Sequence, residues 1–156
     1  MSTVEAYRPE TDTWFAICDM SCRRSGAGVG VLEGLLYAVG GHDGPLVRKS
    51  VEVYNPESNQ WSPVADMHRC RRNAGSVYKS CPRDVLSRLP LLIWFTNFTG
   101  VIANNGMLFV IGGDDGSSNL SSVEFYNPKT DIWTILSSSM ATGRSYAGVC
   151  VIDKPL

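Results

Sequence analysis

The sequence predicts an all-β protein built from the four-stranded blades of an incomplete β-propeller. Three observations carry this prediction. The segments "STVEAYRPETDTW", "KSVEVYNPESNQW" and "SSVEFYNPKTDIW" are repeats that end at Trp14, Trp61 and Trp133. The segment "LLYAVGGHDG" at Leu35 recurs as "MLFVIGGDDG" at Met107. No stretch shows the sustained 3.6-residue period of a helix, and a repeat of about 47 residues is the length of a blade.

The register of the repeats divides the chain into blades. Residues 1–20 are expected to form an outer half-blade, residues 21–67 one full blade and residues 68–140 a second full blade. Residues 141–156 are expected to add one final strand, from Tyr146 to Ile152. These parts do not complete a ring, so the predicted propeller is incomplete.

Each full unit is expected to contain four short antiparallel strands. In the first unit, "GVGVL" and "LLYAV" are rich in β-branched and aromatic residues, and Glu33 and Gly34 between them are a turn signal. The segment "SVEVY" alternates polar and apolar residues, and "NPESNQ" has the composition of a hairpin turn. The segment "WSPVADM" then supplies the fourth strand.

The glycine pairs that begin at Gly40 and Gly112 end the second strand of each full unit. Glycine adopts positive φ at no steric cost, so such a pair serves either a tight turn or a loop that approaches a phosphate. A phosphate loop needs a following helix whose N-terminus faces the phosphate, and here a strand follows. We therefore expect a sharp turn in a crowded part of the blade.

One segment breaks the period of the repeat. Trp14 and Trp61 are 47 positions apart, whereas Trp61 and Trp133 are 72 apart, an excess of 25. A shift of 25 makes Gly75 and Gly100 equivalent, so residues 76–100 are expected to be an insertion. The insertion falls in the innermost strand of the second blade, which is the least tolerant position of a propeller.

The origin of the inserted segment has two explanations. Its apolar end, "LPLLIWFTNF", is unlike a solvent-exposed functional loop, which should be polar. The sequence therefore favours an unspliced or wrongly assigned short intron over a binding loop or a membrane-touching wedge. We expect Val101 to Ala103 to replace Ser76 to Tyr78 as the innermost strand, with the insertion looped out.

Composition argues against several classes of function. Apolar residues make up 44% of the 156 residues and charged residues 19%, which is typical of a globular domain. A net charge of −1 argues against broad contact with nucleic acid or an anionic membrane. The start of the chain has no signal-peptide pattern. The five cysteines include no Cys-x-x-Cys pair, which favours free thiols and a cytoplasmic location.

These repeats are similar to those of a known family. A double glycine after the second strand, followed by tyrosine and tryptophan at fixed spacing, resembles the kelch motif. The segments "RRSGAGVGVL", "CRRNAG" and "TGRSYAGVCVIDKPL" resemble the last repeats of the kelch-like family, and within it kelch-like proteins two and three. The resemblance covers nearly the whole chain except residues 76–100, and it implies a kelch β-propeller.

The resemblance implies a protein-interaction module. Kelch-like proteins carry an N-terminal BTB domain, a BACK domain and a six-bladed propeller that binds a substrate protein, while the BTB and BACK domains dock a cullin-based ubiquitin ligase. This chain has no BTB or BACK segment, so it resembles a fragment that would reach a cullin only through domains absent from it. The alternative is an actin-binding, cytoskeleton-associated kelch protein. A third, less favoured alternative is an enzyme, since some kelch propellers are enzymes.

An antiparallel meander places the loops after the second and fourth strands of each blade on one face. These loops carry arginines beside polar and aromatic side chains, which suit the carboxylates of an acidic segment in a protein substrate. The candidate substrate-binding residues are Arg24, His42, Arg71, Arg72, Asn73, Arg144, Ser145 and Tyr146.

Two interpretations remain open for the arginines that repeat. Arg24, Arg71 and Arg144 each follow a methionine by four positions, so each arginine either contacts a ligand or braces neighbouring blades. Arg72 has no equivalent in every repeat, which favours ligand contact.

The sequence contains no convincing catalytic, cofactor or metal site. Asp114 and Asp115 are adjacent at a strand end, where a turn-stabilising role is favoured over an acid–base pair. His68 and Cys70 lack a second ligand pair at the spacing that zinc requires. We therefore expect a protein that is not an enzyme.

Overall fold

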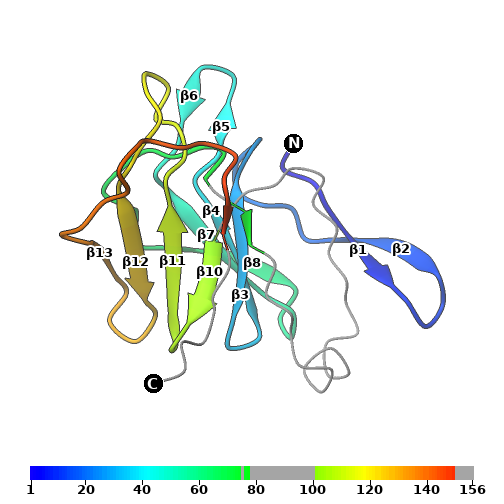
Figure 1. Cartoon of the computed structure of the whole chain (residues 1–156). Helices are drawn as coiled ribbons and strands as arrows, with labels where there is room; N and C mark the ends of the chain where they lie inside the picture. Colours follow the sequence, from blue (N-terminus) through cyan, green and yellow to red (C-terminus); the bar gives the residue numbers. More distant parts are fainter. Residues whose placement is uncertain (75, 78–100, 150–156) are drawn as a thin grey trace.

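The computed structural model describes residues 1–74, 76–77 and 101–149. The regular elements in these ranges are β-strands, and no described helix is long and apolar enough to cross a membrane. Figure 1 shows a two-stranded half-blade at one end, a full blade in the middle and a second full blade at the other end.

Three antiparallel sheets form these parts. The half-blade pairs β1 (Val4–Arg8) with β2 (Thr13–Ile17). The first full blade has the order β3-β4-β7-β8, with bounds Gly28–Leu32, Leu35–Val39, Val51–Asn55 and Gln60–Val64. The second full blade has the order β10-β11-β12-β13, with bounds Val101–Asn104, Met107–Ile111, Val123–Asn127 and Ile132–Ile135. The predicted all-β class and incomplete propeller are confirmed.

Two further strand pairs lie outside the blades. The loop after β4 forms a small hairpin of β5 (His42–Asp43) and β6 (Leu46–Val47). β9 (Ser76–Val77) pairs in parallel with β14 (Gly148–Val149), which is part of the predicted final strand. Residues 150–156, which include the rest of that strand, lie outside the described residues.

The innermost strand of the second blade is β10, which pairs Val101 with Val110 and Ala103 with Leu108. This confirms the expected replacement of the strand that begins at Ser76. Ser76 and Val77 are instead part of β9, and Tyr78 with the remainder of the insertion, to residue 100, lies outside the described residues.

The first full blade is covered on both faces. One face places Leu36, Ala38 and Tyr54 in a core cluster that also contains Val4 and Ala6 of the half-blade. The other face places Tyr37, Val39 and Val51 in a cluster with Leu108, Val110 and Tyr126 of the second blade. Because both faces are covered, the polar positions of the alternating segment "SVEVY" do not mark a solvent face, and Glu52 is only 2% exposed.

The double glycines make the predicted turn. Gly40 and Gly112 have positive φ, at 63° and 65°. A Cβ atom at Gly40 would collide with the Arg71 carbonyl, and one at Gly112 would collide with the Arg144 carbonyl. These close approaches exclude larger side chains, and they hold each glycine pair against the loop that follows the fourth strand of the same unit.

Candidate functional site

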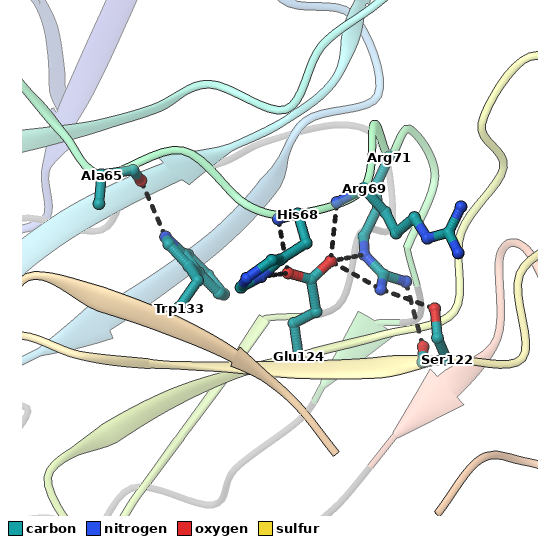
Figure 2. Close-up of polar contacts among 7 residues, drawn as sticks. All are labelled: Ala65, His68, Arg69, Arg71, Ser122, Glu124 and Trp133. Carbon is teal, nitrogen blue, oxygen red and sulfur yellow. Dashed lines mark hydrogen bonds and ion pairs between the residues drawn. The ribbon is translucent and has the colours of Figure 1, made fainter. Parts of the chain in front are cut away.

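A buried ion pair joins the first full blade to the second. Arg71, in the loop after β8, contacts Glu124 of β12, with 2.9 Å between Nη2 and Oε1, and the side chains are 1% and 0% exposed. The Arg71 guanidinium also donates to the carbonyls of Gly112 and Ser122 and to the Ser122 hydroxyl. Figure 2 shows this arginine enclosed by acceptors from the neighbouring blade.

The same glutamate also holds the backbone of the loop. The amides of His68 and Arg69 donate to Glu124 at 2.7 and 3.1 Å, and His68 Nδ1 lies 3.0 Å from Glu124 Oε2. Trp133 Nε1 donates to the Ala65 carbonyl nearby at 2.9 Å. Figure 2 shows these contacts side by side along one junction. We call this set the interblade brace.

An equivalent brace joins the half-blade to the first full blade. Arg24 contacts Glu52 at 2.8 Å, with side chains 1% and 3% exposed, and donates to the carbonyls of Gly40 and Ser50. The Ser21 amide donates to Glu52 at 2.7 Å, and Trp61 Nε1 donates to the Cys18 carbonyl at 2.8 Å. The two junctions therefore use equivalent atoms in equivalent repeats.

Opposing effects act on the pKa of each buried glutamate. Burial raises the pKa of Glu124, but hydrogen bonds from His68 and Arg71 and the Arg71 charge outweigh it and hold the pKa below its ordinary value. Burial likewise raises the pKa of Glu52, and hydrogen bonds from Ser21 and Arg24 outweigh it. Both braces are therefore charged pairs at neutral pH.

These braces bear on the two interpretations left open for the repeated arginines. Arg24 and Arg71 were candidates for ligand contact, but the structure buries both guanidiniums between blades, where they are saturated with acceptors. Sequence reasoning missed their acidic partners. The signal was present, because a glutamate recurs two positions before the repeated tyrosine, at Glu5, Glu52 and Glu124.

Arg72 and Asn73 lie at the mouth of the second junction. Arg72 Nε contacts Asp114 Oδ1 at 2.8 Å, and the two side chains are 29% and 22% exposed. The backbones of Arg72 and Asp114 also exchange hydrogen bonds of 2.9 and 2.8 Å. Asn73 is buried, with its amide donating to the Gly26 carbonyl at 2.9 Å. Arg72 is thus partly accessible to a ligand, whereas Asn73 is buried and links its loop to the loop that contains Gly26.

The remaining candidates lie at the surface. Arg144 is exposed although it occupies the register position of Arg24 and Arg71. Ser145 is half-buried, and Tyr146 is 66% exposed with its amide donating to the Asn73 carbonyl. His42 is half-buried, with Nδ1 2.9 Å from the Gly44 carbonyl.

Backbone hydrogen bonds join the loops on this side into one surface. Ser25 bonds with His42 in both directions, Asn73 donates to Gly26, and Tyr146 donates to Asn73. We call this surface, with the exposed side chains of its loops, the loop face. Arg23 and Arg69 also lie in these loops and are exposed, although neither is among the candidates chosen from the sequence. Arg23 lies 3.5 Å from Asp43.

The weaker candidates have structural contacts. Asp115 accepts hydrogen bonds from the amides of Ser117 and Ser118, which hold its pKa below the ordinary value. Asp114 accepts from the Gly116 amide and from Arg72. His68 contacts Glu124 of the brace. Within the described ranges, no group of three or more His, Cys, Asp or Glu residues could hold a metal ion.

Comparison with protein families identifies the repeat. The family model described as the kelch motif matches residues 23–68 and 96–140. These ranges contain the strands of both full blades.

Comparison with curated proteins gives similar relatives. The chain is 31% identical to kelch-like protein 15 of Danio rerio, over 99% of this chain and 33% of that protein. It is 36% identical to Kelch-like ECH-associated protein 1B of Danio rerio, over 79% of this chain and 17% of that protein. The chain thus spans about a third of the length of kelch-like protein 15. These relatives do not support the expected special likeness to kelch-like proteins two and three.

Comparison with solved structures supports the fold. The structure of YjhT matches with a TM-score of 0.61 at 16% identity, over 85% of this chain and 44% of that chain. At this identity the likeness concerns the arrangement of the strands alone.

Proposed function

Because the chain belongs to the kelch-repeat family, we propose that it is a protein-interaction module whose loop face binds an acidic segment of another protein. In this proposal the chain corresponds to the substrate-binding part of a cullin-dependent ubiquitin ligase adaptor, it acts in the cytoplasm, and it has no catalytic activity. The adaptor role rests on the similarity to kelch-like proteins. The preference for an acidic segment rests on the loop face.

The observation that carries the proposal is the set of exposed cations on the loop face. Loops from successive repeats present Arg23, Arg69 and Arg144, and all three are exposed. Figure 2 shows the Arg69 guanidinium pointing away from Glu124 and the brace. Tyr146, from the same loop as Arg144, adds an exposed aromatic ring. Arginine and tyrosine are frequent at the energetic centres of protein interfaces.

Acidic residues interspersed on the loop face set its selectivity. Arg72 is paired with Asp114, and Arg23 lies near Asp43. A ligand carboxylate must therefore compete with these aspartates for Arg72 and Arg23. The face is expected to recognise a short pattern of spaced carboxylates rather than any polyanion, because two of its cations already have acidic neighbours.

Peptide titration tests this function. We would measure fluorescence anisotropy with one panel of Asp/Glu-rich peptides and one of Lys/Arg-rich peptides, using the wild type and the variants Arg69→Glu and Arg72→Glu. Binding to acidic peptides is expected, with a loss of more than tenfold, or about 1.4 kcal/mol, in either variant. Lys129→Glu is the control, because Lys129 is exposed in the turn between β12 and β13 at the opposite ends of those strands.

Two outcomes would redirect the proposal. If neither panel binds, or if both loop variants bind as the wild type does, the loop face is not the interaction surface. The wild type could also co-sediment with filamentous actin while the Arg69→Glu variant stays in solution. In that case the cytoskeletal alternative replaces the substrate-adaptor role.

A further inference from the structure

Each junction between neighbouring repeats of this chain joins two different faces of their β-sheets. One is the acceptor face, which carries the glutamate, tyrosine and tryptophan of the repeat, as Glu124, Tyr126 and Trp133 do in the second blade. The other is the donor face, which carries the apolar side chains on the opposite side of the sheet together with the arginine loop. The donor face of the first blade, with Tyr37, meets the acceptor face of the second, and the Tyr37 and Tyr126 ring centres lie 5.9 Å apart.

The second blade presents a donor face that no described blade covers. In β11 and β12 buried and half-buried residues alternate, and the half-buried side contains Phe109, Ile111, Val123 and Phe125. The equivalent residues of the first blade include Tyr37, Val39 and Val51, which are only 3%, 3% and 1% exposed because the second blade covers them. The Phe109 and Phe125 ring centres lie 5.7 Å apart and form an apolar platform.

The half-blade presents the matching acceptor face. Trp14 is 52% exposed, whereas its equivalent Trp133 is 3% exposed. Glu5 is exposed, whereas Glu52 and Glu124 are 2% and 0% exposed.

The side chains of this acceptor face already have the geometry of the buried junctions. The Tyr7 and Trp14 ring centres lie 5.3 Å apart, as those of Tyr54 and Trp61 do. The Tyr7 hydroxyl donates to Asp12 at 2.7 Å, as the Tyr126 hydroxyl does to Asp131 at 2.8 Å.

We infer that two copies of this chain associate head to tail, with the donor face of the second blade in one copy packed on the half-blade of the other. Arg144 of the first copy then pairs with Glu5 of its partner, as Arg24 pairs with Glu52 and Arg71 with Glu124 within one chain. The two faces cannot meet within one copy, because the first full blade lies between them (Figure 1). The interface is heterologous, so it closes into a ring or extends as a filament.

The charge complementarity of the proposed junction can be tested by reversing the charge of Glu5 in one variant and of Arg144 in another. Light scattering on the full chain is expected to give a mass of at least two chains for the wild type. Glu5→Arg and Arg144→Glu are each expected to reduce it to one chain, because each places like charges at the junction. An equimolar mixture of the two variants is expected to regain the association, since every junction between unlike copies again pairs opposite charges. Glu57→Arg is the control, because Glu57 is exposed in a turn.

The mixture separates this proposal from nonspecific aggregation. A misfolded variant would not be rescued by mixing with a second misfolded variant, so recovery establishes the Arg144–Glu5 junction. A wild type with the mass of one chain overturns the proposal. So does association that survives both single substitutions, and so does a mixture in which both variants stay single.

Discussion

Arginine has different roles at equivalent positions of this chain, depending on what lies opposite. Arg24 and Arg71 each meet a glutamate and two carbonyls of the next repeat and are buried. Arg144 follows a methionine by the same four positions and is exposed. The sequence pattern predicted the spacing of these arginines but could not decide between brace and ligand contact. That choice depends on a partner 28 or 53 positions away in the chain.

The first prediction concerns the buried pair. Replacing Arg71 by methionine should lower the free energy of unfolding by about 3–5 kcal/mol, because Glu124 is left charged and unpaired in the interior. Urea unfolding followed by tryptophan fluorescence measures this change. Arg69→Met is the matched control, since that side chain is exposed, and its effect should stay within about 0.5 kcal/mol. Equal midpoints for the two variants would show that the brace contributes little.

The second prediction concerns pH. The folded pKa of Glu124 lies below its unfolded value, so its contribution to stability is present above the unfolded value and is lost as pH falls through the folded value. Wild type should be more stable than Glu124→Gln at neutral pH, and the difference should shrink once the pH falls below about 4.5. Urea midpoints across this range, with Glu57→Gln as the exposed control, measure the difference. A gap independent of pH would contradict the assigned pKa direction.

At the scale of the strands, local sequence predicts most of the structure. β3 and β4 coincide with "GVGVL" and "LLYAV", and Glu33 and Gly34 between them both have positive φ. The replacement strand β10 was predictable because the repeat period identifies Val101 as the equivalent of Val29. The parallel pairing of β9 with β14 was not predictable, because Ser76 and Gly148 are 72 positions apart and neither segment has a distinctive pattern.

The third prediction concerns the inserted segment. Deleting residues 76–100 should raise the stability of the chain, because the second blade then enters β10 directly, as the first blade enters β3. A connection of 25 residues costs on the order of 3 kcal/mol of chain entropy to close, which the deletion avoids. The melting temperature should rise by roughly 5–10 °C in differential scanning calorimetry. A lower melting temperature would show that the segment supports the fold. Sequencing transcripts separately tests the proposed intron origin.

At the scale of the whole molecule, each repeat is stabilised by its contacts with the neighbouring repeats. Each brace and each apolar cluster joins one repeat to the next, as in other repeat architectures. The number and order of blades follow from the repeat period alone. The sequence did not predict which faces stay exposed, because Trp14 is exposed and Trp133 is buried in equivalent motifs that have different neighbours.

The last prediction follows from that unequal coverage. The first full blade is covered on both faces, whereas the half-blade has two strands and one covered face. Amide hydrogens of β4 and β7 should therefore exchange most slowly and those of β1 and β2 fastest, with rates differing by roughly tenfold or more, because local opening costs less where fewer apolar contacts break.

Hydrogen exchange followed by mass spectrometry, at a concentration where the chain is a single copy, measures this gradient. Association through the half-blade should slow exchange in β1 and β2 as concentration rises, while β4 should change little because both of its faces are already covered. Uniform protection across the half-blade and the first blade in single copies would show that they unfold as one unit. It would contradict a stability that depends on the number of neighbouring repeats.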